Sequence, residues 1–135
     1  MFGFHHVSLS VTNMNRSVAF YNVLCFKDVL RWKAEDDTLE IVHLKLNDFY
    51  LELFCFANSK PAPYTMKLLD TDLMVVGTRH FGLRVKSIDK AKRLFIENGI
   101  AKTIEIKKGK TGIDYFFIKD PDGIFVEIVQ DDRNL

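Results

Sequence analysis

The stretch His6-Val7-Ser8-Leu9-Ser10-Val11 returns later in the chain as His80-Phe81-Gly82-Leu83-Arg84-Val85, and this pair decides the fold. Each stretch begins with a histidine and then alternates apolar residues with small or polar ones. An alternation with a period of two residues is typical of a strand that is buried on one face. Because the two stretches stand 74 residues apart, they predict a chain made of two similar modules.

The repeat continues into a helix in each module. Residues 15–24 and 89–98 carry apolar side chains at helical spacing, and Asn15 and Asp89 stand where the N-caps are expected. A glycine, Gly99, stands where the second helix would end in a left-handed cap. Cys25 holds the same place in the first module, and a left-handed conformation would strain a residue other than glycine.

Three strand-like runs follow each predicted helix. The runs are 28–34, 38–46, 49–56, 102–107, 113–119 and 124–130. The order predicts an α+β fold of two βαβββ modules, residues 4–56 and 79–131, within a single domain that spans residues 1–135. The connection, residues 57–78, is long for a compact domain and is expected to form an ordered lid or arm. The lysine-rich run 107–110 is interpreted as a solvated turn.

The composition bounds the class of function. With 47% hydrophobic residues, the chain can bury a core, and its net charge of +1 provides no strong field for nucleic acid or an anionic membrane. No apolar run approaches the ~20 residues that span a bilayer, and we see no signal peptide. Cys25 and Cys55 are too few for a disulfide framework. We expect a cytoplasmic protein with two reduced thiols and a small molecule as its partner.

Alternation also predicts which side chains share the strand face that points away from the helix. His6 and His80 fall on that face in the first strand of each module. Glu52 and Glu127 fall on the same face of the last strand, because aliphatic core residues flank each glutamate on both sides. The spacing from histidine to glutamate is 46 residues in the first module and 47 in the second. Each module is therefore predicted to present one imidazole and one carboxylate.

A bound metal explains why this pair of residues repeats. A carboxylate among apolar neighbours is costly unless it is paired, neutral or bound to metal, and two carboxylates brought together repel each other. Two imidazoles and two carboxylates suit Zn, Ni, Co, Mn or Fe. Taken singly, each residue also fits a structural role at the rim of a sheet. His5 is expected to point toward the helix and His43 to have no partner, so both are interpreted as structural.

In this order and spacing the motifs resemble the vicinal oxygen chelate superfamily, which includes glyoxalase I, fosfomycin-resistance proteins, methylmalonyl-CoA epimerase and extradiol dioxygenases. The resemblance covers nearly the whole chain. Its motifs are the two histidine stretches, residues 17–21, Leu51-Glu52-Leu53 and Asp120-Pro121-Asp122-Gly123-Ile124-Phe125-Val126-Glu127-Ile128. It implies a curved mixed sheet around a metal site, and a homodimer whose modules pair within one chain or between two.

The ligand set is most similar to that of bacterial glyoxalase I. The resemblance implies a divalent metal, with Ni, Zn or Co favoured over Mn or Fe, bound by His6, Glu52, His80 and Glu127. It also implies that a glutamate leaves the metal to shuttle a proton. The near-symmetry of the two modules gives no reason to choose between Glu127 and Glu52, and the resemblance favours Glu127.

Two positions depart from the pattern of enzymes that use glutathione. Ser10 stands where those enzymes usually carry an arginine, and Phe56 stands where they tend to carry an asparagine. Both departures argue against the use of glutathione. The residues expected to bind the substrate are Arg84, Tyr50, Phe54, Phe116 and Phe125.

The leading hypothesis is a metal-dependent, glyoxalase-like lyase or isomerase that forms an enediolate from a small substrate with two adjacent oxygen atoms. Two alternatives stay open: an Fe(II) dioxygenase-like enzyme, and a non-catalytic small-molecule binding or resistance protein. Stoichiometric bound metal would argue against the binding protein, and O₂ uptake with Fe(II) would favour the oxygenase.

Overall fold

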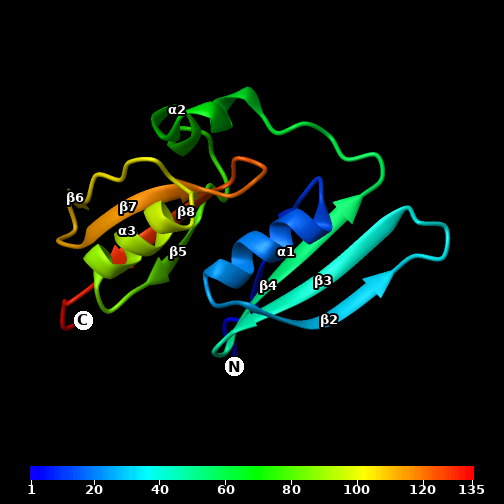
Figure 1. The fold of residues 1–135 in the computed structure, drawn as a ribbon, viewed down its shortest axis with the longest axis horizontal. Helices are drawn as coiled ribbons and strands as arrows, with labels where there is room; N and C mark the ends of the chain where they lie inside the picture. Colours follow the sequence, from blue (N-terminus) through cyan, green and yellow to red (C-terminus); the bar gives the residue numbers. More distant parts are fainter. The chain divides into compact units, whose positions relative to one another are not determined.

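A four-stranded sheet with one helix against it forms the first of two compact units, Met1–Ala62 (Figure 1). Its elements in chain order are β1 (His6–Ser10), α1 (Met14–Val23), β2 (Lys27–Lys33), β3 (Leu39–Leu46) and β4 (Phe49–Phe56). The strands lie in the order β1-β4-β3-β2, and only the β1–β4 pair is parallel. The computed structural model describes all residues, 1–135.

The second unit, Pro63–Leu135, repeats this arrangement. Its elements are the 3₁₀ helix η1 (Tyr64–Lys67), α2 (Leu69–Leu73), β5 (Phe81–Arg84), α3 (Ile88–Glu97), β6 (Lys107–Lys108), β7 (Asp114–Lys119) and β8 (Phe125–Gln130). The strand order β5-β8-β7-β6, with β5 parallel to β8, matches the order in the first sheet. The predicted α+β class with two βαβββ modules is confirmed. No helix in the structure is both long enough and apolar enough to span a membrane.

The buried side chains follow the predicted alternation. In β4, Leu51 and Leu53 are fully buried, while Glu52 between them is only half-buried. In β8, Val126 and Ile128 are buried, and Glu127 between them keeps a partly exposed side chain. The helix-facing side of each sheet is therefore the apolar core, and the opposite face carries the two glutamates.

Three local predictions are wrong. The strand predicted for residues 102–107 is reduced to Lys107–Lys108, because β6 is an edge strand that pairs with β7 at only two positions. Helix α1 begins after Asn13, whose side chain accepts a hydrogen bond from Arg16 N, so Asn15 is not the N-cap. Helix α3 likewise begins after Ser87, which replaces the predicted cap at Asp89. A polar side chain caps a helix only when its own backbone is still extended, as at both residues here.

The connection forms an ordered arm on the second unit. Lys119 Nζ in β7 donates hydrogen bonds to the backbone oxygens of Lys67, at 2.7 Å, and Met66, at 3.5 Å. Asp72 in α2 is 1% exposed, and its Oδ1 lies 3.4 Å from Arg79 Nη1. These contacts tie η1 to β7 and α2 to the segment that leads into β5.

Replacing Cys25 with glycine should stabilise the protein. Cys25 and Gly99 both end their helices with φ at +68°, a region that costs a residue with a Cβ about 1–2 kcal/mol. Glycine removes this strain but loses more backbone entropy on folding, so we expect a net gain of about 1 kcal/mol. Urea unfolding of Cys25→Gly measures the gain. Gly99→Ala is the matched control and should lose stability; a Cys25→Gly protein no more stable than the parent would contradict the strain argument.

Candidate functional site

The first unit places three polar side chains together on the sheet face opposite α1. Glu52 lies between Ser8 of β1 and His43 of β3 in the strand register. Its Oε1 lies 2.9 Å from His43 Nε2, and its Oε2 lies 3.4 Å from His6 Nε2. The glutamate side chain is 20% exposed, so this carboxylate is partly withdrawn from water and has an imidazole at each oxygen.

The second unit places one such pair on the equivalent face. His80 Nε2 lies 3.2 Å from Glu127 Oε2, and the two side chains are 25% and 19% exposed. The register sets Glu127 between Gly82 of β5 and Phe117 of β7. The Phe117 ring meets the His80 ring edge to face at a centroid distance of 4.9 Å. The strand neighbours of this carboxylate are therefore a glycine and an aromatic residue, and neither has a polar side chain.

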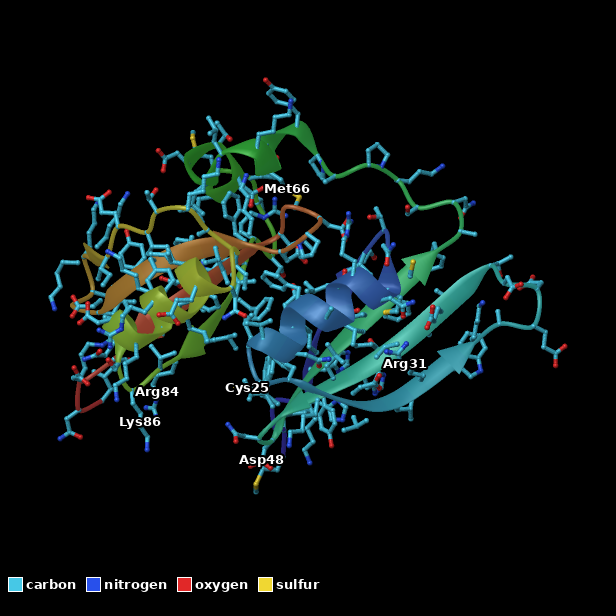
Figure 2. All side chains as sticks on the ribbon, in the orientation of Figure 1. Cys25, Arg31, Asp48, Met66, Arg84 and Lys86 are labelled. Carbon is cyan, nitrogen blue, oxygen red and sulfur yellow. The ribbon has the colours of Figure 1, made fainter.

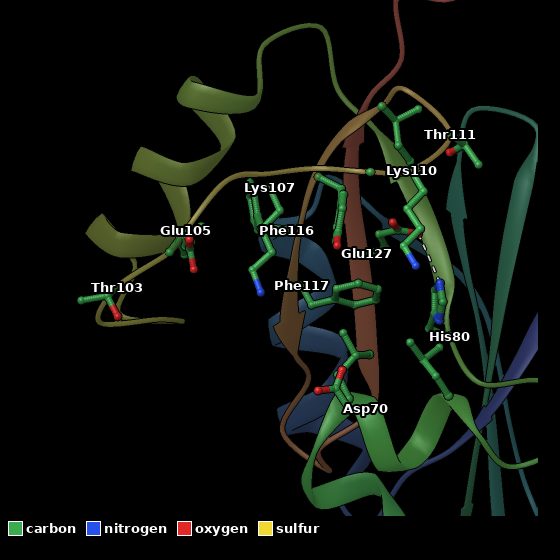
Figure 3. Close-up of a pocket in the computed structure, with 16 residues that line it drawn as sticks. Asp70, His80, Thr103, Glu105, Lys107, Lys110, Thr111, Phe116, Phe117 and Glu127 are labelled. Carbon is green, nitrogen blue, oxygen red and sulfur yellow. Dashed lines mark hydrogen bonds and ion pairs between the residues drawn. The ribbon is translucent and has the colours of Figure 1, made fainter.

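A pocket of about 620 Å³ lies beside His80 and Glu127, within the second unit (Figure 3). Helix α2 forms one wall through Leu69 and Leu73, and the segment from Thr103 to Ile113 contributes the opposite wall. Lys107 and Lys110 line the pocket as well, and Figure 3 shows their side chains extending into it. Both lysines are exposed, as the interpretation of this run as solvated predicts, and they border the pocket as well.

The predicted substrate-binding residues are spread over both units. Phe116 lines the pocket, although it is 2% exposed and packs against Phe95 of α3. Phe125 is also buried, beneath the ammonium group of Lys119, and it does not line the pocket. Tyr50 and Phe54 are half-buried residues of β4, on the same face as Glu52.

Arg84 lies away from the pocket. It is exposed at the end of β5 (Figure 2) and is absent from the pocket walls. Hydrogen bonds from the side chain and backbone of Arg133 lower the pKa of Asp131 to about 2, and the charge of Arg84 adds to this effect. Arg84 thus acts electrostatically on the C-terminal segment.

The structure corrects both statements about the other histidines. His5 does not point to the helix side, because its ring stacks on Tyr50 at 5.2 Å and its Nδ1 lies 2.9 Å from His6 Nδ1. The alternation does not extend to His5, since β1 begins only at His6. His43 does have a partner, Glu52. The tight turn at residues 47–48 could have revealed this partner, because a two-residue hairpin loop sets the register of its strands.

The distances within each pair suit a shared metal. Two ligand atoms bound about 2.0–2.1 Å from one ion, at angles of about 90–110°, lie about 2.8–3.4 Å apart. The His6–Glu52 and His80–Glu127 separations of 3.4 and 3.2 Å fall in this range, although hydrogen-bonded ion pairs have similar lengths. His80 Nδ1 is buried without a partner, so this imidazole has unused bonding capacity.

The four predicted ligands are divided equally between the two units. No group of three or more His, Cys, Asp or Glu side chains in the structure is arranged to hold a metal ion. Each unit contributes one nitrogen and one oxygen donor of the kind that Zn, Ni or Co accepts. The donor chemistry of the residues in each pair therefore fits a divalent metal.

Comparisons with known proteins agree with this architecture. The family model of the Glyoxalase/Bleomycin resistance protein/Dioxygenase superfamily matches residues 3–128. The uncharacterized protein YwkD of Bacillus subtilis (strain 168) is 30% identical over 128 residues, which cover 93% of this chain and 94% of that protein.

Solved structures share the fold at lower identity. A glyoxalase family protein from Enterococcus faecalis is 24% identical with a TM-score of 0.78, and the match covers 95% of this chain and 97% of that one. The trypanothione-dependent glyoxalase I of Leishmania major is 18% identical with a TM-score of 0.70, over 96% and 87% of the two chains. A bleomycin-binding protein complexed with bleomycin is 20% identical with a TM-score of 0.66, over 98% and 100%.

Proposed function

The chain belongs to the Glyoxalase/Bleomycin resistance protein/Dioxygenase superfamily, and we propose that it is a divalent-metal-dependent lyase or isomerase. Its substrate is a small molecule with two adjacent oxygen atoms, which reacts through an enediolate. The observation that carries this proposal is the repeated pair, His6 with Glu52 and His80 with Glu127, at equivalent places in two sheets. A protein that only binds apolar ligands would not require a histidine–glutamate pair in each unit.

His6, Glu52, His80 and Glu127 would hold the metal, with the two units paired within one chain or between the chains of a homodimer. When bound, the metal supplies Lewis acidity that stabilises negative charge on the two oxygen atoms of the substrate. Ni, Zn or Co suits this role and this ligand set. The protein contributes the ligands, the pocket walls and the proton transfer.

Glu127 is the better placed of the two glutamates to transfer the proton. It lines the pocket, and its strand neighbours Gly82 and Phe117 offer its carboxylate no side-chain hydrogen bond. A Cβ added at Gly82 would lie 3.7 Å from Glu127 Oε2, in ordinary van der Waals contact, so the glycine leaves room for a small group beside this oxygen. Glu127 would take a proton from the carbon beside a carbonyl and return it to the neighbouring carbon. Glu52, with an imidazole at each oxygen, would stay in place.

The pocket indicates the kind of substrate. Its volume of about 620 Å³ accommodates a small molecule, and Phe117 and Leu73 provide apolar surface in its walls. Lys107 and Lys110 line the pocket together with Asp70 and Glu105, so its walls offer groups of both charges to the polar atoms of a substrate. Ser10 and Phe56 replace the residues expected in glutathione-using enzymes, so we propose a substrate other than a glutathione adduct.

Proton exchange with solvent tests the function without knowledge of the product. The chain loaded with Ni²⁺, Zn²⁺ or Co²⁺ is incubated in D₂O with a panel of small α-hydroxycarbonyl compounds and 2-oxoaldehyde–thiol adducts. We expect metal-dependent deuterium incorporation at the carbon beside the carbonyl of at least one compound, detected by proton NMR. Full metal loading with no exchange and no product across the panel would contradict the proposal. Binding without exchange would favour the non-catalytic alternative, and O₂ uptake with Fe²⁺ would favour the oxygenase.

A further inference from the structure

The two half-sites differ in the residue that lies across from the glutamate on the middle strand. In the first unit that residue is His43, and in the second it is Phe117. The neighbours on the other side differ too, with Ser8 beside Glu52 and Gly82 beside Glu127. The two modules therefore differ at this point, although their sequences repeat. Glu52 lies between two polar residues, whereas Glu127 lies between a glycine and a phenylalanine.

The contact between His43 and Glu52 is a direct cross-strand pair. The two residues are opposite each other in the antiparallel β3–β4 ladder, so the backbone itself brings their side chains together. His43 Nε2 lies 2.9 Å from Glu52 Oε1, which is closer than the 3.4 Å between His6 Nε2 and Glu52 Oε2. His43 is only 29% exposed, so the pair is partly shielded from water. The two oxygens of Glu52 thus have separate partners.

We propose that His43 is a positioning residue that donates a hydrogen bond from Nε2 to Glu52 Oε1 and leaves Oε2 free, beside His6, to bind the metal. The proposal rests on the function proposed above. His43 is not assigned as a ligand, because His6, His43 and Glu52 together are not arranged to hold an ion. Residues that hydrogen-bond a ligand carboxylate orient it, and their loss typically weakens metal binding about 10–100-fold.

A chemical consequence distinguishes the two carboxylates. Glu52 is held on its second oxygen and cannot turn without losing the His43 hydrogen bond, whereas Phe117 places no such restraint on Glu127. His43 therefore makes Glu52 the fixed ligand of the pair. This role uses a residue that the second module does not repeat.

Titration of metal-free protein with Co²⁺, followed by visible absorption, tests this role directly. His43→Phe gives the first unit the residue found in the second, and we expect it to weaken Co²⁺ binding about 10–100-fold. His43→Gln retains an N–H donor of similar reach and should recover most of the affinity. Lys45→Ala removes another polar side chain from the same face of β3 and should leave the affinity unchanged. Urea unfolding of the metal-free variants separates loss of the hydrogen bond from loss of the fold.

Equal Co²⁺ affinity in His43→Phe and the parent would overturn the proposal while leaving the metal-dependent function intact. Equal weakening in His43→Gln and His43→Phe would also overturn it, since the hydrogen bond would not be the cause. A parent protein that binds no Co²⁺ would overturn both the positioning role and the proposed function.

A second measurement requires no variant. Nitrogen-15 NMR of the metal-free parent identifies which ring nitrogen of His43 carries a proton. We expect a proton on Nε2, because only that form donates to Glu52. A neutral His43 protonated on Nδ1 alone would overturn the assignment.

Discussion

Glu127→Gln is expected to lower the rate of solvent exchange, measured per bound metal ion, by about 10²–10⁴-fold. This is the usual contribution of a positioned general base or acid. Glutamine keeps an oxygen that can bind metal, but its amide cannot accept and return the proton. Glu127 lies in the wall of the pocket beside His80, whereas neither of the other two lining carboxylates, Asp70 and Glu105, is paired with His80.

Glu52→Gln is the matched variant for this experiment. Because Glu52 is assigned a fixed role as a ligand, its loss should weaken metal binding more than it slows exchange per bound ion. The rate is measured by NMR in D₂O at saturating metal for both variants. Near-normal exchange in Glu127→Gln, with a large loss in Glu52→Gln, would transfer the proton-transfer role to Glu52.

Asp72→Ala is expected to destabilise the protein by about 2–4 kcal/mol. The carboxylate is 1% exposed and pairs with Arg79, whose side chain is itself only 24% exposed. Removal of one partner from a buried ion pair leaves the other charge uncompensated, which costs about 3–5 kcal/mol at full burial. The partial exposure of Arg79 lowers this figure. Arg79 Nε is already buried without a hydrogen-bond partner. Loss of Asp72 would leave Arg79 Nη1 without its carboxylate partner as well.

Urea unfolding of four variants separates the ion pair from a general effect on α2. These are the single changes at Asp70, Asp72 and Arg79 and the double change at Asp72 and Arg79. Asp70→Ala, at an exposed position in the same helix, should change stability by less than about 0.5 kcal/mol. The double variant Asp72→Ala with Arg79→Ala should be less destabilised than the two single changes added together. Additive losses would mean that the pair contributes no coupling energy.

The predicted fold follows from features that are local in the sequence. The histidine stretches, the alternation around Glu52 and Glu127, and the turn at 120–123 each depend on residues close together along the chain. Burial in the structure follows the same alternation, because a pleated strand leaves no other choice of face. The strand predicted at 102–107 is mostly absent from the structure. A strand forms only where a neighbouring strand pairs with it, and β6 pairs with β7 at only two positions.

Cross-strand partners are the part of the site that alternation alone does not predict. The roles of His43 and Phe117 depend on register, which places both opposite a glutamate. The two-residue turn at Asn47 and Asp48, where Asn47 has φ at +53°, carries enough information to set the first register. The docking of α2 through Asp72 has no such signal, because a buried aspartate in a short helix is not distinguishable from an exposed one by its spacing.

We propose that the two histidine–glutamate pairs complete one metal site. Metal analysis of untagged protein purified without chelator, together with the Ala variants at His6, Glu52, His80 and Glu127, tests it most directly. We expect about one divalent ion per chain in the parent and a large loss of metal in each of the four variants. A parent protein that holds no metal even after reconstitution, or that keeps its metal when a pair is removed, would contradict it.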